Sequence, residues 1–371
     1  MPVPGAADAP AQEGGGPSVR LGISVCITTR GRAALLDRCL AALHAQTGTD
    51  PFELLVCCQG DGDAAAVVRS HFPDATIGLV EEAYPGGARN FLIDRARGEL
   101  LLFLDDDVTF GTALLSRLTG LADDFPDVGV FGGPNLTPPD SSFFQEVQGA
   151  ILGSVLATGP VRRRYGRHPA GLADERFFTL CNMAVRRAAM TSFPPSLSGG
   201  EENALLHELA VRQVPMHYDP ELIVFHERRN TYRGFATQME KYGRGRGQVM
   251  IRSPRSTRVS HLLPLGLLAW MVSLPIVAVL WSPWYLLSLA VYALALLAAG
   301  SAVALGFVGP SLARRAGGVL IGAGLTATVH VCYGAGVLRG ILRRRRTPQS
   351  EWQHLGGPSE VQSPFPTDQL A

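Results

Sequence analysis

The sequence of 371 residues lacks several features that would assign it to other classes of protein. Its formal net charge of only +1 argues against bulk attraction to nucleic acid. The six cysteines show no metal-ligand spacing and mostly fall in apolar runs, which indicates buried thiols in a reducing compartment rather than a disulfide framework. Residues 1–20 lack the basic start and apolar stretch of a signal peptide, so we expect a disordered tail there.

Long apolar runs, by contrast, are present near the C-terminus. Three segments, at 261–281, 284–307 and 318–337, are each about long enough to cross a bilayer as a helix. From Arg228 to Arg258 there are nine Lys or Arg residues and only one acid, Glu240, which is typical of a membrane-surface face. We therefore expect a basic amphipathic interfacial segment over 230–260, two or three membrane helices over 261–338, and a basic, then disordered, tail over 339–371.

The third apolar segment leaves the topology open. It contains His330, Tyr333 and several glycines, so it can be a packed span, a re-entrant piece or an interfacial helix. Basic residues before the first segment, after the second and at 343–346 all favour the cytoplasmic side, and three full spans would violate that rule once. This pattern favours an incomplete third crossing, with a tail on the far side as the alternative. We expect a multi-pass inner-membrane protein with a cytoplasmic soluble region.

Residues 21–229 alternate between strand and helix patterns. Apolar, β-branched runs predict strands at 21–28, 52–58, 76–80, 100–104 and 128–131, and helical periodicity is found at 33–46, 64–70, 88–96 and 113–121. This order predicts an α/β domain with a mostly parallel sheet. The first strand is followed by TTRGR instead of a dinucleotide fingerprint, and no Walker loop is present, which disfavours a Rossmann dehydrogenase.

Three consecutive carboxylates, Asp105, Asp106 and Asp107, follow the apolar strand LLFL. Carboxylates packed so closely repel one another, and a hard divalent ion with bound phosphates commonly offsets that repulsion. The ends of strands are also where open α/β sheets hold ligands. The alternative is a solvated acidic turn that caps the next helix.

Five separated pieces of the sequence, in this order, resemble the family 2 glycosyltransferases, which have a nucleotide-diphospho-sugar-binding GT-A fold. The pieces are SVCITTRGR with LDRCLAAL, FELLVCCQGDGD, GGARN with RGELLLFLDDDV, LCNMAVRR with GGEEN, and VFHERR. The resemblance covers about residues 21–229. It implies transfer of a sugar from a nucleotide-diphospho-sugar donor with the help of Mg or Mn.

The resemblance also implies roles for individual residues. Asp105 and Asp107 match the DxD motif that holds the metal on the donor diphosphate, with His226 near the metal or diphosphate. Asp106 either supports the structure or contacts ribose. Asn182 either orients donor hydroxyls or serves a turn, and His226 can likewise be a satisfied structural residue. Further donor-binding candidates are Thr28, Arg30, Gln59 and Arg89, of which Arg89 has a guanidinium suited to phosphate.

Glu202, in GGEEN, matches an acidic pair of the family in which aspartate is usual, which implies the role of catalytic base. Inverting transfer needs a carboxylate that takes the proton of the acceptor hydroxyl as this attacks the anomeric carbon. Glu201 is the competing choice. A third interpretation is that both acids decorate the first turn of a helix over 203–211.

Two departures from the family bear on the substrates. Cys58 and Gln59 stand where an aspartate often reads the nucleoside, so UDP, TDP and GDP sugars all stay open as donors. QMEKY, at 238–242, stands near the place of the QxxRW motif of processive synthases, and we favour a lipid-facing role for it over contact with sugar or phosphate.

Together these features predict a membrane-anchored, metal-dependent, inverting glycosyltransferase. By resemblance to bacterial exopolysaccharide glycosyltransferases, its acceptor is expected to be a lipid-linked saccharide in envelope polysaccharide synthesis, with membrane lipids and other polysaccharide-assembly proteins as partners. A polyprenyl-phosphate sugar synthase is the first alternative. The second is a non-catalytic membrane scaffold with a degenerate transferase domain, for which Cys58 and Gln59 are the main argument.

Overall fold

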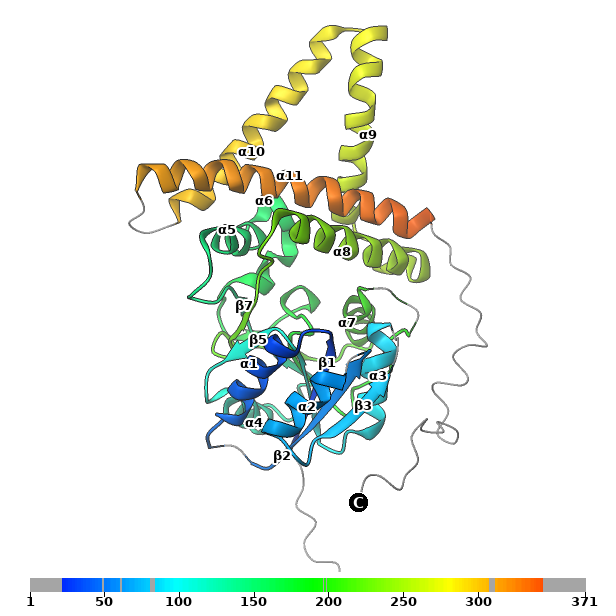
Figure 1. Ribbon diagram of the computed structural model, residues 1–371. Coiled ribbons are helices and arrows are strands. Elements are labelled where there is room, and N and C mark those ends of the chain that lie inside the picture. The colour runs from blue at the N-terminus through cyan, green and yellow to red at the C-terminus, as the bar shows by residue number, and fades with distance from the viewer. Residues whose placement is uncertain are drawn as a thin grey trace, which may run out of the picture.

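The protein is described by a computed structural model over residues 22–48, 50–60, 62–80, 84–195, 197, 199–306 and 311–342. The tail predicted over 1–20 lies outside these residues, and so does the tail predicted over 339–371 except for residues 339–342, which belong to the last helix, α11 (Leu312–Leu342). A soluble α/β domain occupies one side of the molecule and the apolar C-terminal helices lie on the other (Figure 1).

An eight-stranded mixed sheet lies at the centre of the soluble domain, with the strand order β3-β2-β1-β4-β9-β6-β10-β8. Strands β1 to β4 are parallel to one another, which confirms the predicted α/β class. β9 runs antiparallel between β4 and β6. The strands are β1 (Ile23–Arg30), β2 (Phe52–Gln59), β3 (Thr76–Val80), β4 (Leu100–Asp105), β6 (Val130–Gly132), β8 (Gly171–Leu172), β9 (Asn182–Arg186) and β10 (Met216–Tyr218).

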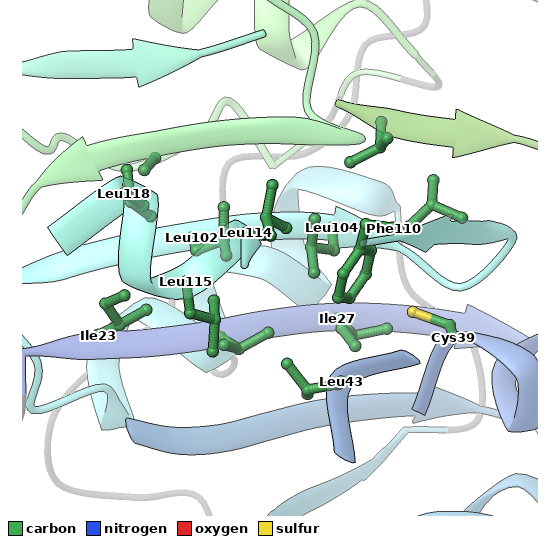
Figure 2. Packing of buried hydrophobic residues seen from close by; sticks show 14 of the residues in the cluster. Ile23, Ile27, Cys39, Leu43, Leu102, Leu104, Phe110, Leu114, Leu115 and Leu118 are labelled. Carbon is green, nitrogen blue, oxygen red and sulfur yellow. The ribbon is translucent and has the colours of Figure 1, made fainter. Parts of the chain in front are cut away.

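Helices cover both faces of this sheet. α1 (Ala33–His44), α2 (Gly62–His71) and α4 (Leu114–Asp124) contribute to the hydrophobic cluster on one face, and α3 (Pro85–Arg95) and α7 (Glu201–Val211) contribute to the cluster on the other. In Figure 2 the leucines of α4 pack over the apolar side chains of β1 and β4. Each fully buried leucine contributes roughly 1.5–3 kcal/mol to this packing. The parallel strand ends are thereby held in fixed positions.

A small three-stranded sheet extends the strand ends, in the order β5 (Val108–Phe110), β11 (Val224–His226) and β7 (Asn135–Leu136). β11 pairs antiparallel with β5, and the register places His226 opposite Val108. This pairing brings His226 next to the acidic cluster, from which it is more than a hundred residues distant in sequence. The sequence patterns predicted neither β5 nor β7.

A separate layer of helices lies between the central sheet and the apolar helices. The layer contains α5 (Phe143–Leu152), α6 (Val155–Thr158), the short 3-10 helices η1 (Gly159–Tyr165) and η2 (Glu175–Phe177), and α8 (Tyr232–Arg252). Buried residues of α5 and α8, such as Ile151 and Phe235, share one core cluster with Leu325 of α11 (Leu312–Leu342). α8 and the 3-10 helix η3 (Pro254–Ser256) occupy most of the segment predicted as basic and amphipathic.

Three helical segments are long and apolar enough to cross a membrane: Val259–Leu280, Pro283–Leu305 and Leu312–Leu342. The first is α9, the second joins the 3-10 helix η4 (Pro283–Leu286) to α10 (Leu287–Leu305), and the third is α11. α9 and α10 form a hairpin that projects away from the soluble domain, whereas α11 lies across its base beside α8 (Figure 1). The three helices thus differ in their orientation to the domain.

Glycines allow α8 and α11 to approach closely, as small residues do between packed helices. A Cβ atom at Gly247 would lie 2.3 Å from the carbonyl oxygen of Val337, and one at Gly340 would lie 2.3 Å from that of Arg244. Larger residues cannot replace these glycines without separating the helices. Within the third apolar segment, Gly336 serves the same packing, because a Cβ there would lie 2.2 Å from the carbonyl oxygen of Glu240.

Candidate active site

A single large cavity of about 2080 Å³ joins the soluble domain to the apolar helices. Its lining begins at the ends of β1, β2 and β4, with Thr28, Gln59 and Asp105, and extends to His261 on α9 and Tyr333 on α11. Pockets for one small ligand typically measure roughly 300–1,000 Å³, so this cavity has room for two substrates.

Asp105, Asp107 and His226 offer ligand atoms that all lie within 4.8 Å of one another. The imidazole Nε2 of His226 is 2.9 Å from the Oδ1 atom of Asp107. Carboxylate oxygens and an imidazole nitrogen are donors that Mg and Mn accept in proteins. The donor set therefore fits the divalent ion implied by the sequence.

Neighbouring charges set the ionisation of this cluster. Burial alone would raise the pKa of Asp107, but His226 and Arg32 together hold it below its usual range. Burial alone would lower the pKa of His226, and the ion pair with Asp107 instead raises it to about 10. The side-chain amide of Asn135 lies 3.2 Å from Nδ1 of the same ring and fixes its orientation. Asp107 is thus kept as a carboxylate directed at the cavity.

Asp106 differs from its two neighbours because it is fully buried and does not line the cavity. The Thr29 hydroxyl donates a 2.7 Å hydrogen bond to its carboxylate, and Arg32 lies 2.5 Å from its other oxygen. Burial raises the pKa of Asp106 to about 6 despite Arg32. Its contacts join the ends of β1 and β4, which favours the supporting role over contact with ribose.

Arg89 connects the acidic cluster to α7. From the first turns of α3, its guanidinium lies 2.5 Å from Glu201 and 3.4 Å from Asp105. Burial raises the pKa of Glu201, an effect that Arg89 opposes and Glu202 reinforces. Arg89 therefore holds Glu201 and Asp105 toward the same end of the cavity.

Glu202 faces a different neighbour. Its Oε1 atom lies 2.9 Å from Arg164 of η1, and its Oε2 atom lies 3.5 Å from the Thr179 hydroxyl. The acid stands in the first turn of α7, which follows Gly200 in a left-handed conformation with φ 78° that favours glycine. Gly200 thus permits the turn that places two adjacent acids along the cavity.

The structure brings most of the predicted site residues to one cavity. Those that line it are Thr28, Arg30, Gln59, Arg89, Asp105, Asp107, Glu202 and His226. Asn182 does not line it, because its buried amide donates a 2.6 Å hydrogen bond to the carbonyl oxygen of Leu222. This contact favours the structural role for Asn182 over the orientation of donor hydroxyls.

Other lining residues were missed or assigned differently from sequence. Arg32 pairs with both Asp106 and Asp107, and its place in TTRGR, two residues after the end of β1, was the available signal. Arg164 lies in a run of three arginines that matches no motif. Gln238, Lys241 and Tyr242 line the cavity, although a lipid-facing role was favoured for their segment.

Residues 24–192 match the model of glycosyl transferase family 2. Among solved structures, the chain is similar to the mannosyltransferase PcManGT from Pyrobaculum calidifontis in complex with GDP-Man and Mn²⁺, with 18% identity, a TM-score of 0.53 and coverage of 91% of each chain. It is also similar to residues 1–349 of TarS from S. aureus in complex with UDP-GlcNAc, with 16% identity, a TM-score of 0.45 and coverage of 61% of this chain and 66% of that one. No curated protein matches it.

Proposed function

This protein carries a glycosyl transferase family 2 domain and is a glycosyltransferase with a GT-A fold, and we propose that it transfers a sugar from a nucleotide-diphospho-sugar to a membrane-associated acceptor. The observation that carries the proposal is the position of Asp105, Asp107 and Glu202 on one cavity that also reaches the apolar helices. An enzyme with a soluble donor and a lipid-borne acceptor needs such a connection. The position of these three carboxylates on one cavity also argues against the alternative of a non-catalytic scaffold.

The donor belongs at the strand ends. Asp105, Asp107 and His226 would hold a divalent ion, which would supply positive charge to the diphosphate as its bond to the sugar breaks. Arg89 is placed to contact phosphate oxygens, since a guanidinium suits phosphate geometry and Arg89 already lies beside Asp105. Gln59, at the end of β2, lines the same region and can hydrogen-bond to the nucleobase.

Glu202 is the proposed general base. The acceptor hydroxyl oxygen attacks the anomeric carbon, its proton passes to the Glu202 carboxylate, and the electron pair of the broken C–O bond leaves with the diphosphate, so that the configuration inverts. Glu201 is less suited to this role because it shares Arg89 with Asp105 and is directed toward the donor phosphates. The Oε2 atom of Glu202 has only long contacts, at 3.4–3.5 Å, and can accept the proton.

The arrangement of the apolar helices supports two membrane crossings, by α9 and α10. Polar contacts join α11 to elements of the soluble domain near its start, middle and end. Arg314 pairs with Glu146 at 2.7 Å, and His330 lies 2.8 Å from the carbonyl oxygen of Leu156. Arg339 pairs with Glu240 at 3.2 Å. A helix fixed in this way lies along the membrane surface. Both ends of the hairpin and the basic residues after α11 then share the cytoplasmic side, in agreement with the positive-inside rule.

A turnover assay tests the proposal. Detergent-solubilised protein is given UDP, TDP and GDP sugars with membrane lipid extract, with and without Mn²⁺, and release of nucleoside diphosphate is measured. We expect release that depends on both metal and lipid for one class of donor. Absence of release and of binding for every donor, with folded protein and complete lipid extract, would contradict the proposal.

A further inference from the structure

The two adjacent acids at the start of α7 are held by different arginines. Arg89, which comes from the first turns of α3, lies 2.5 Å from Glu201. Arg164, which comes from the 3-10 helix η1, lies 2.9 Å from Glu202. All four side chains line the cavity. The two glutamates are therefore neighbours in sequence, but a separate cation fixes the position of each carboxylate.

Arg164 is itself held firmly in place. It is buried, with 8% of its surface exposed, and its Nη1 atom donates to Oε1 of Glu202. Its Nη2 atom donates to the side-chain oxygen of Asn203 at 3.2 Å and to the carbonyl oxygen of Glu175 at 3.4 Å. A guanidinium is a planar fork, so the bonds of Nη2 also fix the direction in which Nη1 points. The cation is thus oriented by groups other than the carboxylate that it binds.

The ion pair occupies one oxygen of the Glu202 carboxylate and leaves the other for chemistry. Oε1 has the 2.9 Å contact with Arg164. Oε2 has long contacts, at 3.5 Å to the Thr179 hydroxyl and 3.4 Å to the Leu180 amide. A general base must present an oxygen that lies within hydrogen-bond reach of the proton it takes. The ion pair with Arg164 therefore selects Oε2 as the oxygen that receives this proton.

We propose that Arg164 is a positioning residue for the transfer reaction, which orients the Glu202 carboxylate so that Oε2 faces the acceptor hydroxyl. The inference rests on the proposed function, because it takes Glu202 as the base, and it deepens that function by naming the group that orients the base. Charge-assisted hydrogen bonds such as the one between Arg164 and Glu202 are about twice as strong as neutral ones. This bond is therefore strong enough to define one orientation of the carboxylate.

The length of the Glu202 side chain explains why an orienting group is needed. A glutamate is one methylene longer than the aspartate that is usual in the acidic pair of the family, so its carboxylate can reach more positions unless a contact restrains it. A misplacement of about 1 Å between reacting groups can cost on the order of 10²-fold in rate. Because Asn203 and Glu175 hold Arg164, the arginine restrains the carboxylate instead of moving with it.

Steady-state kinetics of the full chain in detergent, with nucleotide sugar and membrane lipid extract, test this role. In Arg164→Gln we expect kcat to fall roughly 10- to 100-fold, while KM for the nucleotide sugar stays within about twofold of wild type. Arg164→Lys keeps the charge but lacks the planar fork, and its kcat should be at least about threefold above that of Arg164→Gln. The matched control is Arg162→Gln, which removes an exposed arginine of η1 that does not line the cavity and should leave kcat unchanged.

A double-mutant cycle with Glu202→Gln separates positioning of the base from a general effect on the fold. If Arg164 acts through Glu202, Arg164→Gln should lower kcat by less than about twofold once the carboxylate is gone. The same fractional loss of kcat in both backgrounds would overturn the proposal and would mean that Arg164 only stabilises the wall of the cavity. Wild-type kcat in Arg164→Gln, or a loss confined to KM for the nucleotide sugar, would overturn it as well.

The same cycle keeps this inference apart from the proposed function. If Glu202→Gln lowers kcat and Arg164→Gln lowers it equally in both backgrounds, the transferase and its base stand and only the role of Arg164 is wrong. If Glu202→Gln retains wild-type kcat, the assignment of the base is wrong and the role of Arg164 is wrong with it. An unchanged KM for the nucleotide sugar shows that each variant is folded.

Discussion

The two ends of the cavity use charge in opposite ways. At the donor end, cations and carboxylates already pair within the protein: Arg32 with Asp106 and Asp107, and Arg89 with Asp105 and Glu201. At the opposite end, Glu175 compensates Arg258 while Arg246 and Arg255 pair with no carboxylate of the described chain. The donor end is thus organised in advance around a fixed set of charges. The end lined by Arg246, Arg255 and Arg258 instead keeps positive charge that no carboxylate of the described chain neutralises.

Removing a carboxylate at the donor end should have the largest effect. In Asp107→Asn one oxygen ligand and one negative charge are lost, and we expect nucleoside diphosphate release to fall on the order of 10³-fold. The control is Asp123→Asn, which changes an exposed acid of α4 and should leave the rate unchanged. Folded Asp107→Asn protein with wild-type turnover would show that the acidic cluster does not serve the donor.

Changes to the two glutamates of α7 should have the next largest effects, and these effects should differ from each other. Glu202→Gln removes the proposed base. A positioned base contributes roughly 10²–10⁴-fold, and we expect kcat to fall on the order of 10²-fold, at the lower end of that range, while donor binding persists. In Glu201→Gln we expect kcat to fall less, roughly tenfold, because this change removes only the ion pair that holds Arg89. Single-turnover rates of both variants measure the difference. The reverse order would assign the base to Glu201.

Overpacking the interface of α8 and α11 should have a smaller effect, on stability. In Gly247→Ala the new methyl group must move the carbonyl of Val337, and such overpacking costs about 1–3 kcal/mol in the free energy of unfolding. Gly324→Ala on α11 is the matched control, since no atom lies within 4 Å of its new Cβ, and alanine there should gain up to about 1 kcal/mol. The melting temperatures of Gly247→Ala and Gly324→Ala, measured by thermal unfolding in detergent, would show this difference. Equal destabilisation of both variants would argue against close packing of α8 on α11.

Charge outside the cavity should matter least for transfer. Arg117 pairs with the buried Asp219 at 2.6 Å; burial alone would raise the pKa of Asp219, but the hydrogen bond from Arg117 lowers it. The resulting stability is present above the unfolded pKa of about 3.9 and is lost as pH falls through the lower folded value. Arg117→Gln should therefore lose about 1 kcal/mol of stability at pH 7, and progressively less as pH falls through the lowered pKa of Asp219. The check is to measure the free energy of unfolding of both proteins across an acid pH series, together with a transfer rate that should not change.

Local patterns were sufficient to predict most of the first half of the domain. The strand at 76–80 and the helix from 33 agree with the structure because their apolar residues recur with the period of the element they form. The acidic cluster was found for the same reason, since its three carboxylates end a strand. The antiparallel β9 and the strands β5 and β7 were missed because short strands joined to distant partners leave no periodic signal.

The region between the sheet and the apolar helices depends on contacts that no local pattern records. Arg164 meets Glu202 from 38 residues away, and Arg314 meets Glu146 across 168 residues. Hydropathy places α11 among the candidate spans, and its contacts with α5, α6 and α8 are what supports our proposal that it lies along the membrane surface. The same distance in sequence explains why the segment at 238–242 was expected to face lipid.

The most direct test of the account is to follow the sugar itself. Protein in bilayer nanodiscs with membrane lipid extract is given the donor that it turns over, labelled in the sugar, and the label is partitioned between water and organic solvent. The account predicts that label enters the organic phase in step with nucleoside diphosphate release. Label that stays in water while the diphosphate is released would contradict transfer to a lipid acceptor.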